Sequence, residues 1–165
     1  MANLSIRAKF FLKTIVLIAM LTMAQKGFSQ QSKVLDSLLY IYETTREDSV
    51  KIYTIVELSR EHLYSNMKLS LEYAEKSLTL AEKTTSKRLM TYAVFNLGVV
   101  YFELGAYEIS AKYFFRYLDF KKESGNPNEI AYAVANIGAI KIQMKQYDQA
   151  EEMFLESLKI LRSCQ

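Results

Sequence analysis

The sequence predicts an all-α fold, a right-handed solenoid of antiparallel helix hairpins, on three observations. The chain repeats itself with a fixed period, since Tyr92 to Gly98 recur at Tyr132 to Gly138, and a period of about 20–50 residues is typical of solenoids. Apolar residues recur at steps of three and four, which is the spacing of one helix face. The 165 residues include only five glycines and one proline, so few positions would interrupt helices.

The repeat is clearest between residues 92–124 and residues 132–164. The identical pairs are Tyr92/Tyr132, Ala93/Ala133, Val94/Val134, Asn96/Asn136, Gly98/Gly138, Tyr107/Tyr147, Phe114/Phe154 and Leu118/Leu158. In the first copy one apolar stripe ends before Gly105 and a second begins at Tyr107. Each copy therefore predicts two helices joined by a short break, which is an antiparallel hairpin.

Gly98 and Gly138 lie inside the first predicted helix of their copies, where a glycine costs roughly 1 kcal/mol relative to alanine. We expect both to lie where the partner helix crosses, because no side chain fits at a close crossing. The partner helices supply a small residue and, one turn later, an aromatic ring: Ser110 and Phe114 in one copy, Ala150 and Phe154 in the other.

This pattern resembles the tetratricopeptide repeat, in which a leucine-glycine pair and a tyrosine on the first helix precede a small residue and an aromatic on the second. The matching residues are Leu97, Gly98, Tyr101, Gly105, Tyr107, Ser110 and Phe114, then Ile137, Gly138, Tyr147, Ala150 and Phe154. Lys141 and Lys145 depart from the pattern at the positions of Tyr101 and Gly105. The period is longer than the roughly 34 residues of the common form, and in this respect the chain resembles the extended-helix variety of the family.

The other elements follow from the same spacing. Residues 32–45 predict an amphipathic helix capped by Ser32, within an N-terminal segment at 31–47. A more degenerate copy with Leu58-Ser59 in place of Leu97-Gly98 precedes the other two, which gives three repeats at about 48–86, 87–126 and 127–165. We expect helices at 32–45, 48–64, 67–84, 87–104, 107–123, 129–144 and 147–162.

Residues 1–30 are typical of an export signal. They contain four basic residues and no acidic one, and the apolar stretch from Thr14 to Ala24 is shorter than the ~20 residues that span a bilayer. We expect cleavage near Ser29–Gln31 and a periplasmic or secreted product with no stable membrane span. The alternatives are an uncleaved helix that anchors the protein in the inner membrane, or a buried core helix.

Removal of residues 1–30 would change the net charge of the protein. The chain has 21 Lys+Arg and 18 Asp+Glu, and four of the basic residues (Arg7, Lys9, Lys13, Lys26) lie in the first 30. The remainder holds 17 basic and 18 acidic residues. The net charge of the mature part is therefore −1 and gives no indication of nucleic-acid binding.

No residue pattern indicates catalysis or a metal. His62 is the only histidine and Cys164 the only cysteine, so neither has a second ligand at a metal-binding spacing and no internal disulfide can form. Glycine-rich phosphate loops and nucleophile elbows are absent from the sequence. We expect no enzyme activity and no cofactor, and a partly buried structural position for His62.

The resemblance implies a groove for a peptide or a partner helix, lined by the first helices of successive repeats. The matching residues are Tyr92, Phe95, Asn96, Val99, Phe102, Tyr132, Asn136, Ala139 and Ile142, to which the first repeat would add Val56, Arg60, Leu63 and Tyr64. Asn96 and Asn136 match the asparagine that hydrogen-bonds the ligand backbone in some family members. The basic residues of the carboxylate-clamp members are replaced by Phe95, Val99, Ala135 and Ala139, which favours an apolar ligand segment. Alternatively, the aromatic residues pack on an adjacent chain.

We therefore expect an exported protein-interaction module, resembling the exported N-terminal sensory region of bacterial repeat-containing signalling proteins. The alternative is a truncated sensory region of an envelope receptor, a histidine kinase or helix-turn-helix regulator, that lacks its output domain. The last predicted helix carries Leu158 and Leu161 with no later helix to cover them. We expect self-association through this C-terminal edge, or a missing downstream segment.

Overall fold

The computed structural model describes residues 33–163, and it confirms the all-α solenoid. A first helix covers residues 33–44, and the others are α2 (Asp48–His62), α3 (Met67–Glu82), α4 (Lys87–Glu103), α5 (Tyr107–Ser124), α6 (Pro127–Gln143) and α7 (Tyr147–Arg162). Within that range there is no strand. Every helix boundary lies within two residues of its predicted place. The expected export signal lies outside the described residues, as does Cys164.

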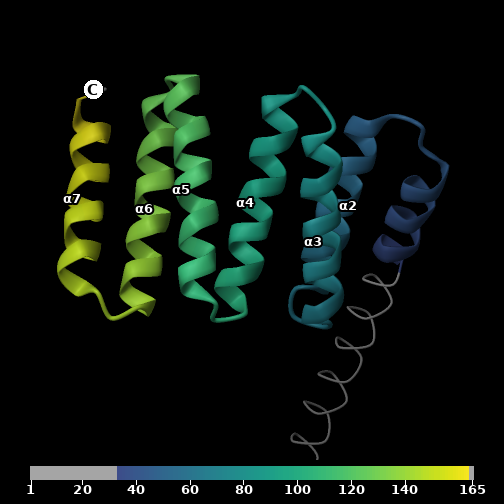
Figure 1. Ribbon diagram of the computed structural model, residues 1–165, viewed down its shortest axis with the longest axis horizontal. Helices are drawn as coiled ribbons and strands as arrows, with labels where there is room; N and C mark the ends of the chain where they lie inside the picture. The colour runs from purple at the N-terminus through teal and green to yellow at the C-terminus, as the bar shows by residue number, and fades with distance from the viewer. Residues whose placement is uncertain (1–32, 164–165) are drawn as a thin grey trace, which may run out of the picture. The chain divides into compact units, whose positions relative to one another are not determined.

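The helices from α2 to α7 belong to one compact unit that begins at Leu38, and they pack in chain order (Figure 1). Three hairpins form, α2 with α3, α4 with α5 and α6 with α7, and neighbouring hairpins contact each other through α3 with α4 and α5 with α6. α2 also contacts α4 directly. This last contact brings the first helices of the first two hairpins together.

Polar side chains and glycine mark the helix ends. Asn66 accepts a hydrogen bond from the backbone of Leu69 at the start of α3, and Ser86 accepts one from Leu89 at the start of α4. Between α5 and α6, Gly125 adopts a left-handed conformation and Asn126 caps the next helix. Pro127 then occupies the first turn, where its missing N–H leaves no bond unmade. This explains why α6 begins two residues before its expected start.

The turn between α6 and α7 has the same geometry as the turn between α4 and α5, although Lys145 replaces Gly105. Gly105 has φ 73° and Lys145 has φ 58°. The backbone N–H of Ala106 donates to the carbonyl of Tyr101 at 2.9 Å, and that of Gln146 donates to Lys141 at the same distance. Lys145 therefore adopts a conformation that glycine adopts at lower cost.

The predicted close crossings at Gly98 and Gly138 are confirmed. A Cβ atom on Gly98 would lie 3.0 Å from the ring of Phe114, and one on Gly138 would lie 3.1 Å from the ring of Phe154. In the first hairpin, Ser59 takes the place of Gly98. At the repeat position of Phe114, the same hairpin has the small residue Ala74. Because Ala74 is smaller than the Phe114 ring, the crossing of α2 and α3 has room for the Ser59 side chain.

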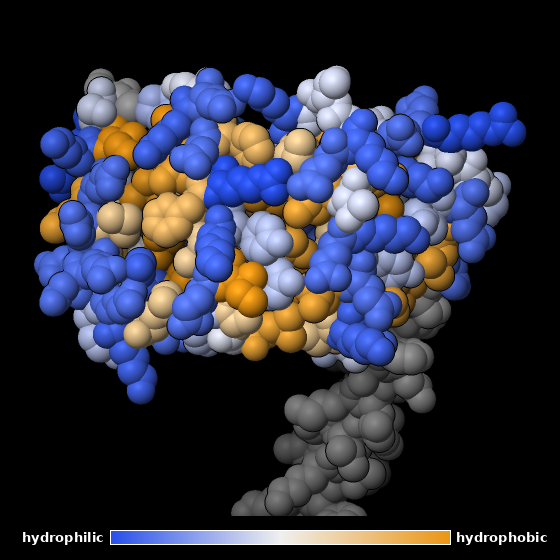
Figure 2. All heavy atoms as spheres, in the orientation of Figure 1, coloured by the Kyte–Doolittle hydropathy of each residue, from blue (hydrophilic) through white to orange (hydrophobic). Residues whose placement is uncertain are grey.

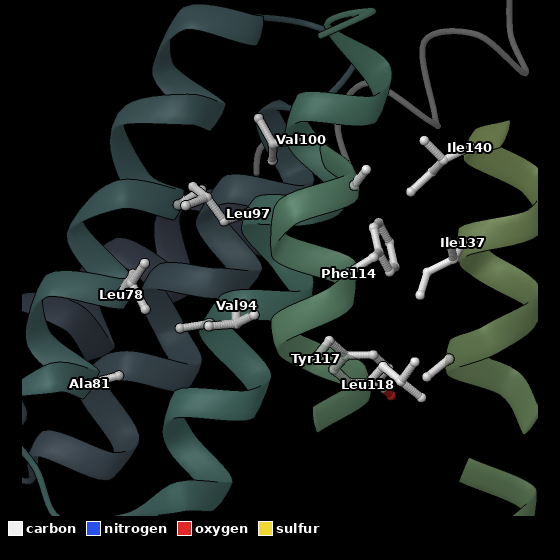
Figure 3. Close-up of a cluster of buried hydrophobic side chains, with 14 of the residues drawn as sticks. Leu78, Ala81, Val94, Leu97, Val100, Phe114, Tyr117, Leu118, Ile137 and Ile140 are labelled. Atoms are coloured by element: carbon white, nitrogen blue, oxygen red, sulfur yellow. The ribbon is translucent and has the colours of Figure 1, made fainter. Parts of the chain in front are cut away.

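One continuous core joins the hairpins. Figure 3 shows buried side chains of α3, α4, α5 and α6 that point toward one another between the helices. Those labelled are Leu78, Ala81, Val94, Leu97, Val100, Phe114, Tyr117, Leu118, Ile137 and Ile140. The helices are thus held by apolar packing between neighbours, as in other solenoids.

The outer face of α7 differs from the equivalent faces of α3 and α5. Leu78 and Leu118 are 9% and 6% exposed, whereas Leu158 at the same repeat position is 47% exposed. Hydrophobic residues lie among the charged ones at this end of the molecule (Figure 2). Among the helices that the structure describes, none has the length and hydropathy to cross a bilayer.

Candidate functional site

A groove lies over α2, α4 and the start of α6, with the C-terminal half of α5 as its other side. Its volume is about 740 Å³, within the ~300–1,000 Å³ common for ligand sites. The lining residues are Tyr53, Arg60, Lys87, Arg88, Thr91, Tyr92, Phe95, Tyr117, Phe120, Lys121, Glu123, Ser124 and Tyr132. Aromatic and basic side chains dominate this set.

Three tyrosines of the groove share one position in the repeat. Tyr53, Tyr92 and Tyr132 follow one another at intervals of nearly one repeat period, so the stacking of α2, α4 and α6 places them on the same face. The rings of Tyr53 and Tyr92 meet edge to face at 5.0 Å between centroids. Tyr132 is 54% exposed and offers an aromatic surface to a ligand.

Two arginines accompany the tyrosines of α2 and α4. Nη1 of Arg60 donates to the Tyr92 hydroxyl at 2.9 Å and to Oε1 of Glu57 at 2.8 Å. The Tyr92 hydroxyl in turn donates to the same Glu57 oxygen at 2.5 Å. The guanidinium carbon of Arg88 lies 5.8 Å from the centroid of the Tyr53 ring, within reach of a cation–π contact.

Burial raises the pKa of two tyrosines of the groove lining. The pKa of Tyr92 is raised to about 12, first by burial and then by its hydrogen bond to Glu57. Burial also raises the pKa of Tyr117 to about 12, with a further contribution from the negative charge of Glu129. Both hydroxyls therefore keep their protons to a higher pH than an exposed tyrosine does.

An aromatic cluster lines the groove where α4, α5 and α6 meet. The ring centroid of Phe95 lies 4.9 Å from that of Tyr117 and 6.3 Å from that of Tyr132. Lys121 extends over Tyr117, with Nζ 5.2 Å from the ring centroid, and also forms a 3.0 Å ion pair with Glu129. The cluster can receive an apolar side chain of a ligand next to a positive charge.

The charges of the lining are unequal, with four basic residues and the single carboxylate of Glu123. Nζ of Lys87 lies 2.7 Å from Glu123, so these two charges balance. Arg88 is exposed and forms no ion pair with any residue that the structure describes. The groove therefore carries excess positive charge around Arg88, at the N-terminal end of α4.

Four of the residues expected to bind a partner line the groove: Tyr92, Phe95 and Tyr132, and Arg60 of the first repeat. The others lie outside the lining: Asn96, Val99, Phe102, Asn136, Ala139 and Ile142, and Val56, Leu63 and Tyr64 of the first repeat. Asn96 is 1% exposed, and its Nδ2 donates to the Ser59 hydroxyl at 2.9 Å. Its amide thus connects α4 to α2 inside the stack and does not reach the groove surface.

Most of the repeat-signature residues serve packing, whereas Tyr147 is 63% exposed and Gly105 lies in the exposed turn of its hairpin. Leu97, Gly98, Ser110, Phe114, Ile137, Gly138 and Ala150 are buried. Tyr101 stacks on Tyr113 at 5.6 Å between centroids, and Phe102 packs edge to face on Tyr107 at 5.6 Å. His62 is partly buried and stacks on Tyr73 at 5.9 Å. The described residues include no cluster of three His, Cys, Asp or Glu side chains arranged to hold a metal.

Sequence reasoning missed Tyr53, Lys87, Arg88, Tyr117 and Lys121 as groove residues. The repeat offset contained a signal for Tyr53, which precedes Tyr92 by almost one full period. Arg88 precedes Tyr92 by one helical turn on α4, so the i, i+4 spacing contained a signal for it too. Lys121 belongs to α5, and only the packing of α5 beside α4 and α6 brings it to the groove.

Solved structures with the same fold include two helical-repeat proteins. The apo form of RapI matches with a TM-score of 0.65 and 20% identity, over 74% of this chain and 46% of that one. BtubC (BKLC) from P. vanneervenii matches with a TM-score of 0.62 and 16% identity, over 84% of this chain and 57% of that one. The chain thus spans about half the length of each, and identities this low show a shared fold alone. No protein-family model matches the sequence, and no curated protein does.

Proposed function

We propose that this protein is an exported interaction module of tetratricopeptide-like repeats that binds a peptide or partner protein in the groove over α2, α4 and α6. One observation carries the proposal: Tyr53, Tyr92 and Tyr132 repeat at one position and line a single groove. Aromatic side chains supply much contact area with few rotatable bonds. A row of them along successive hairpins suits an extended or helical polypeptide.

The helical-repeat fold shared with RapI and BtubC supports a protein partner. Export rests on residues 1–30, whose basic start and short apolar stretch are typical of a signal. In the alternative, the chain is the sensory region of an envelope receptor that continues beyond the repeats.

The groove is tested by affinity capture from an envelope extract, followed by mass spectrometry, with a matched pair of variants. Tyr132→Ala removes an exposed ring inside the groove, and Phe115→Ala removes one of similar exposure, 45%, outside the groove lining. We expect a captured protein to be lost with Tyr132→Ala and retained with Phe115→Ala. Equal capture by both variants would place the partner on another surface.

Export is tested separately by expression with the native start. We expect the product in the envelope or medium, shorter by about 30 residues. An N-terminal sequence that begins at Met1 on a membrane-bound product would instead establish the anchor.

A further inference from the structure

We infer that the groove's partner is an acidic peptide segment, with a carboxylate bound at Arg88 and Arg60 and an apolar side chain on Phe95 and Tyr132. This inference rests on the proposed function, since it specifies the chemistry of the partner that the groove takes.

Arg88 supplies the unbalanced charge. It is exposed, lines the groove and has no ion-pair partner in the part of the chain that the structure describes. The Tyr53 ring lies beside its guanidinium at 5.8 Å. A guanidinium presents a rigid fork of donors that matches the two oxygens of a carboxylate. A ligand carboxylate at this place would neutralise the excess charge of the lining.

Arg60 adds donors that are already oriented. Its Nη1 binds both Glu57 and the Tyr92 hydroxyl, which hold the side chain in the groove. Nη2 makes no hydrogen bond with a described residue, so it can donate to a ligand. Glu57 balances the charge of Arg60. We therefore expect Arg60 to orient the ligand and Arg88 to contribute more to its affinity.

The aromatic cluster sets the second requirement. Phe95, Tyr117 and Tyr132 line the groove where α4, α5 and α6 meet, and Tyr132 is 54% exposed. An apolar or aromatic side chain next to the acidic one would cover these rings. The partner is thus a segment in which acidic and apolar residues alternate closely, and not a wholly apolar one.

Two other occupants fit the charges less well. Residues 1–32 contain four basic residues and no acidic one, so the positive groove would repel them. A nucleic acid would be favoured by a strongly basic surface, but the chain after residue 30 has 17 basic and 18 acidic residues. Lys87, Lys121 and Arg60 each already pair with a glutamate. A short acidic peptide needs only the local excess around Arg88.

The test is a selection of phage-displayed random dodecapeptides on the purified protein as expressed with its native start. The best binder is then made as a fluorescein-labelled peptide, together with a version in which every Asp and Glu is replaced by Asn and Gln. Binding is measured by fluorescence anisotropy for the wild type, Arg88→Ala, Tyr132→Ala and Arg162→Ala. Arg162 is an exposed arginine outside the groove lining and serves as the control for a general loss of charge. A labelled dodecathymidylate reports nucleic-acid binding.

We expect selected peptides rich in Asp or Glu beside apolar residues, and binding about tenfold or more weaker for the amide version. Arg88→Ala should weaken binding of the acidic peptide several-fold without affecting that of the amide version, and Arg162→Ala should change neither. Melting temperatures of the variants confirm that each is folded.

The remaining outcomes separate the two levels of the proposal. If selected peptides lose binding with Tyr132→Ala but the amide version binds as well as the acidic one, the acidic partner is overturned and the groove remains a peptide site. If no selected peptide depends on Tyr132, both the acidic partner and the proposed groove function are overturned. Tight binding of dodecathymidylate that is lost with Arg88→Ala, without acidic peptide binders, would replace the peptide with a nucleic acid.

Discussion

Nδ2 of Asn96 donates a hydrogen bond to the Ser59 hydroxyl, at 2.9 Å, and so connects α4 to α2 inside the stack. Ser59 also exchanges hydrogen bonds with Ser70 of α3. In the next repeat the equivalent amide, Nδ2 of Asn136, is buried and has no hydrogen-bond partner among the described residues. The reason is local: Gly98 occupies the place of Ser59 and offers no hydroxyl.

Substitution of these two asparagines should therefore have unequal effects. Asn96→Ala removes the donor to Ser59 and should lower the free energy of unfolding by about 1–3 kcal/mol. Asn136→Ala removes an amide whose Nδ2 is already unsatisfied, so we expect a clearly smaller loss. Urea denaturation of both variants measures the difference. An equal loss would indicate that Asn136 has a partner of comparable strength, such as an ordered water.

Gly98, which occupies the repeat position of Ser59, lies against Phe114. We expect substitutions at Gly98 and Phe114 to be energetically coupled. Gly98→Ser should destabilise the protein by roughly 1–3 kcal/mol, because its Cβ would meet the Phe114 ring at 3.0 Å. In a Phe114→Ala background, which copies Ala74 of the first hairpin, the added serine should be much less harmful. A double-mutant cycle on unfolding free energies gives the coupling, and a value near zero would show that the crossing is not limited by this ring.

Much of the fold could be predicted because its signals are local. The spacing of apolar residues gave the helix boundaries, and the paired Gly98 and Phe114 gave the crossing. The groove was predicted in part, through Tyr92, Phe95 and Tyr132 on one face. Arg88 was overlooked although it lies one helical turn before Tyr92 on α4. Lys121 was not predicted, because it belongs to α5, whose placement depends on the packing of α4, α5 and α6. The family resemblance placed Asn96 at the groove surface. It lies instead inside the stack, because the Ser59 hydroxyl offers its amide a buried hydrogen-bond acceptor.

Lys145 gives a stabilising prediction. Its φ of 58° costs a non-glycine residue about 1 kcal/mol, so Lys145→Gly should raise the free energy of unfolding by up to about that amount. Gly105→Ala is the reciprocal change and should lower it by a similar amount. No atom lies within 4 Å of a Cβ on Gly105, so the effect there would come from the backbone alone. Thermal unfolding of both variants tests the pair, and a destabilised Lys145→Gly would contradict it.

Tyr92 predicts an alkaline dependence of stability. Its folded-state pKa of about 12 lies above the ordinary value of 10.0, so the unfolded state loses this proton at lower pH than the folded state. The resulting stability is present below pH 10 and is lost as the pH rises toward 12. We expect the Tyr92→Phe variant to lose less stability over this interval than the wild type. Tyr64→Phe, at an 83% exposed tyrosine, is the control, and identical pH profiles for all three proteins would contradict the prediction.

The outer face of α7 predicts self-association. Leu158 is 47% exposed where Leu118 is 6% exposed, and a solenoid end normally carries a polar capping face. Leu161 on the same helix is 39% exposed. A second copy that covers these leucines would restore the burial of the inner repeats, so we expect a concentration-dependent dimer. Leu158→Glu should shift the protein to monomer in sedimentation or light-scattering measurements, whereas Phe115→Glu, outside this face, should not. A monomer at all concentrations, unaffected by Leu158→Glu, would contradict the prediction.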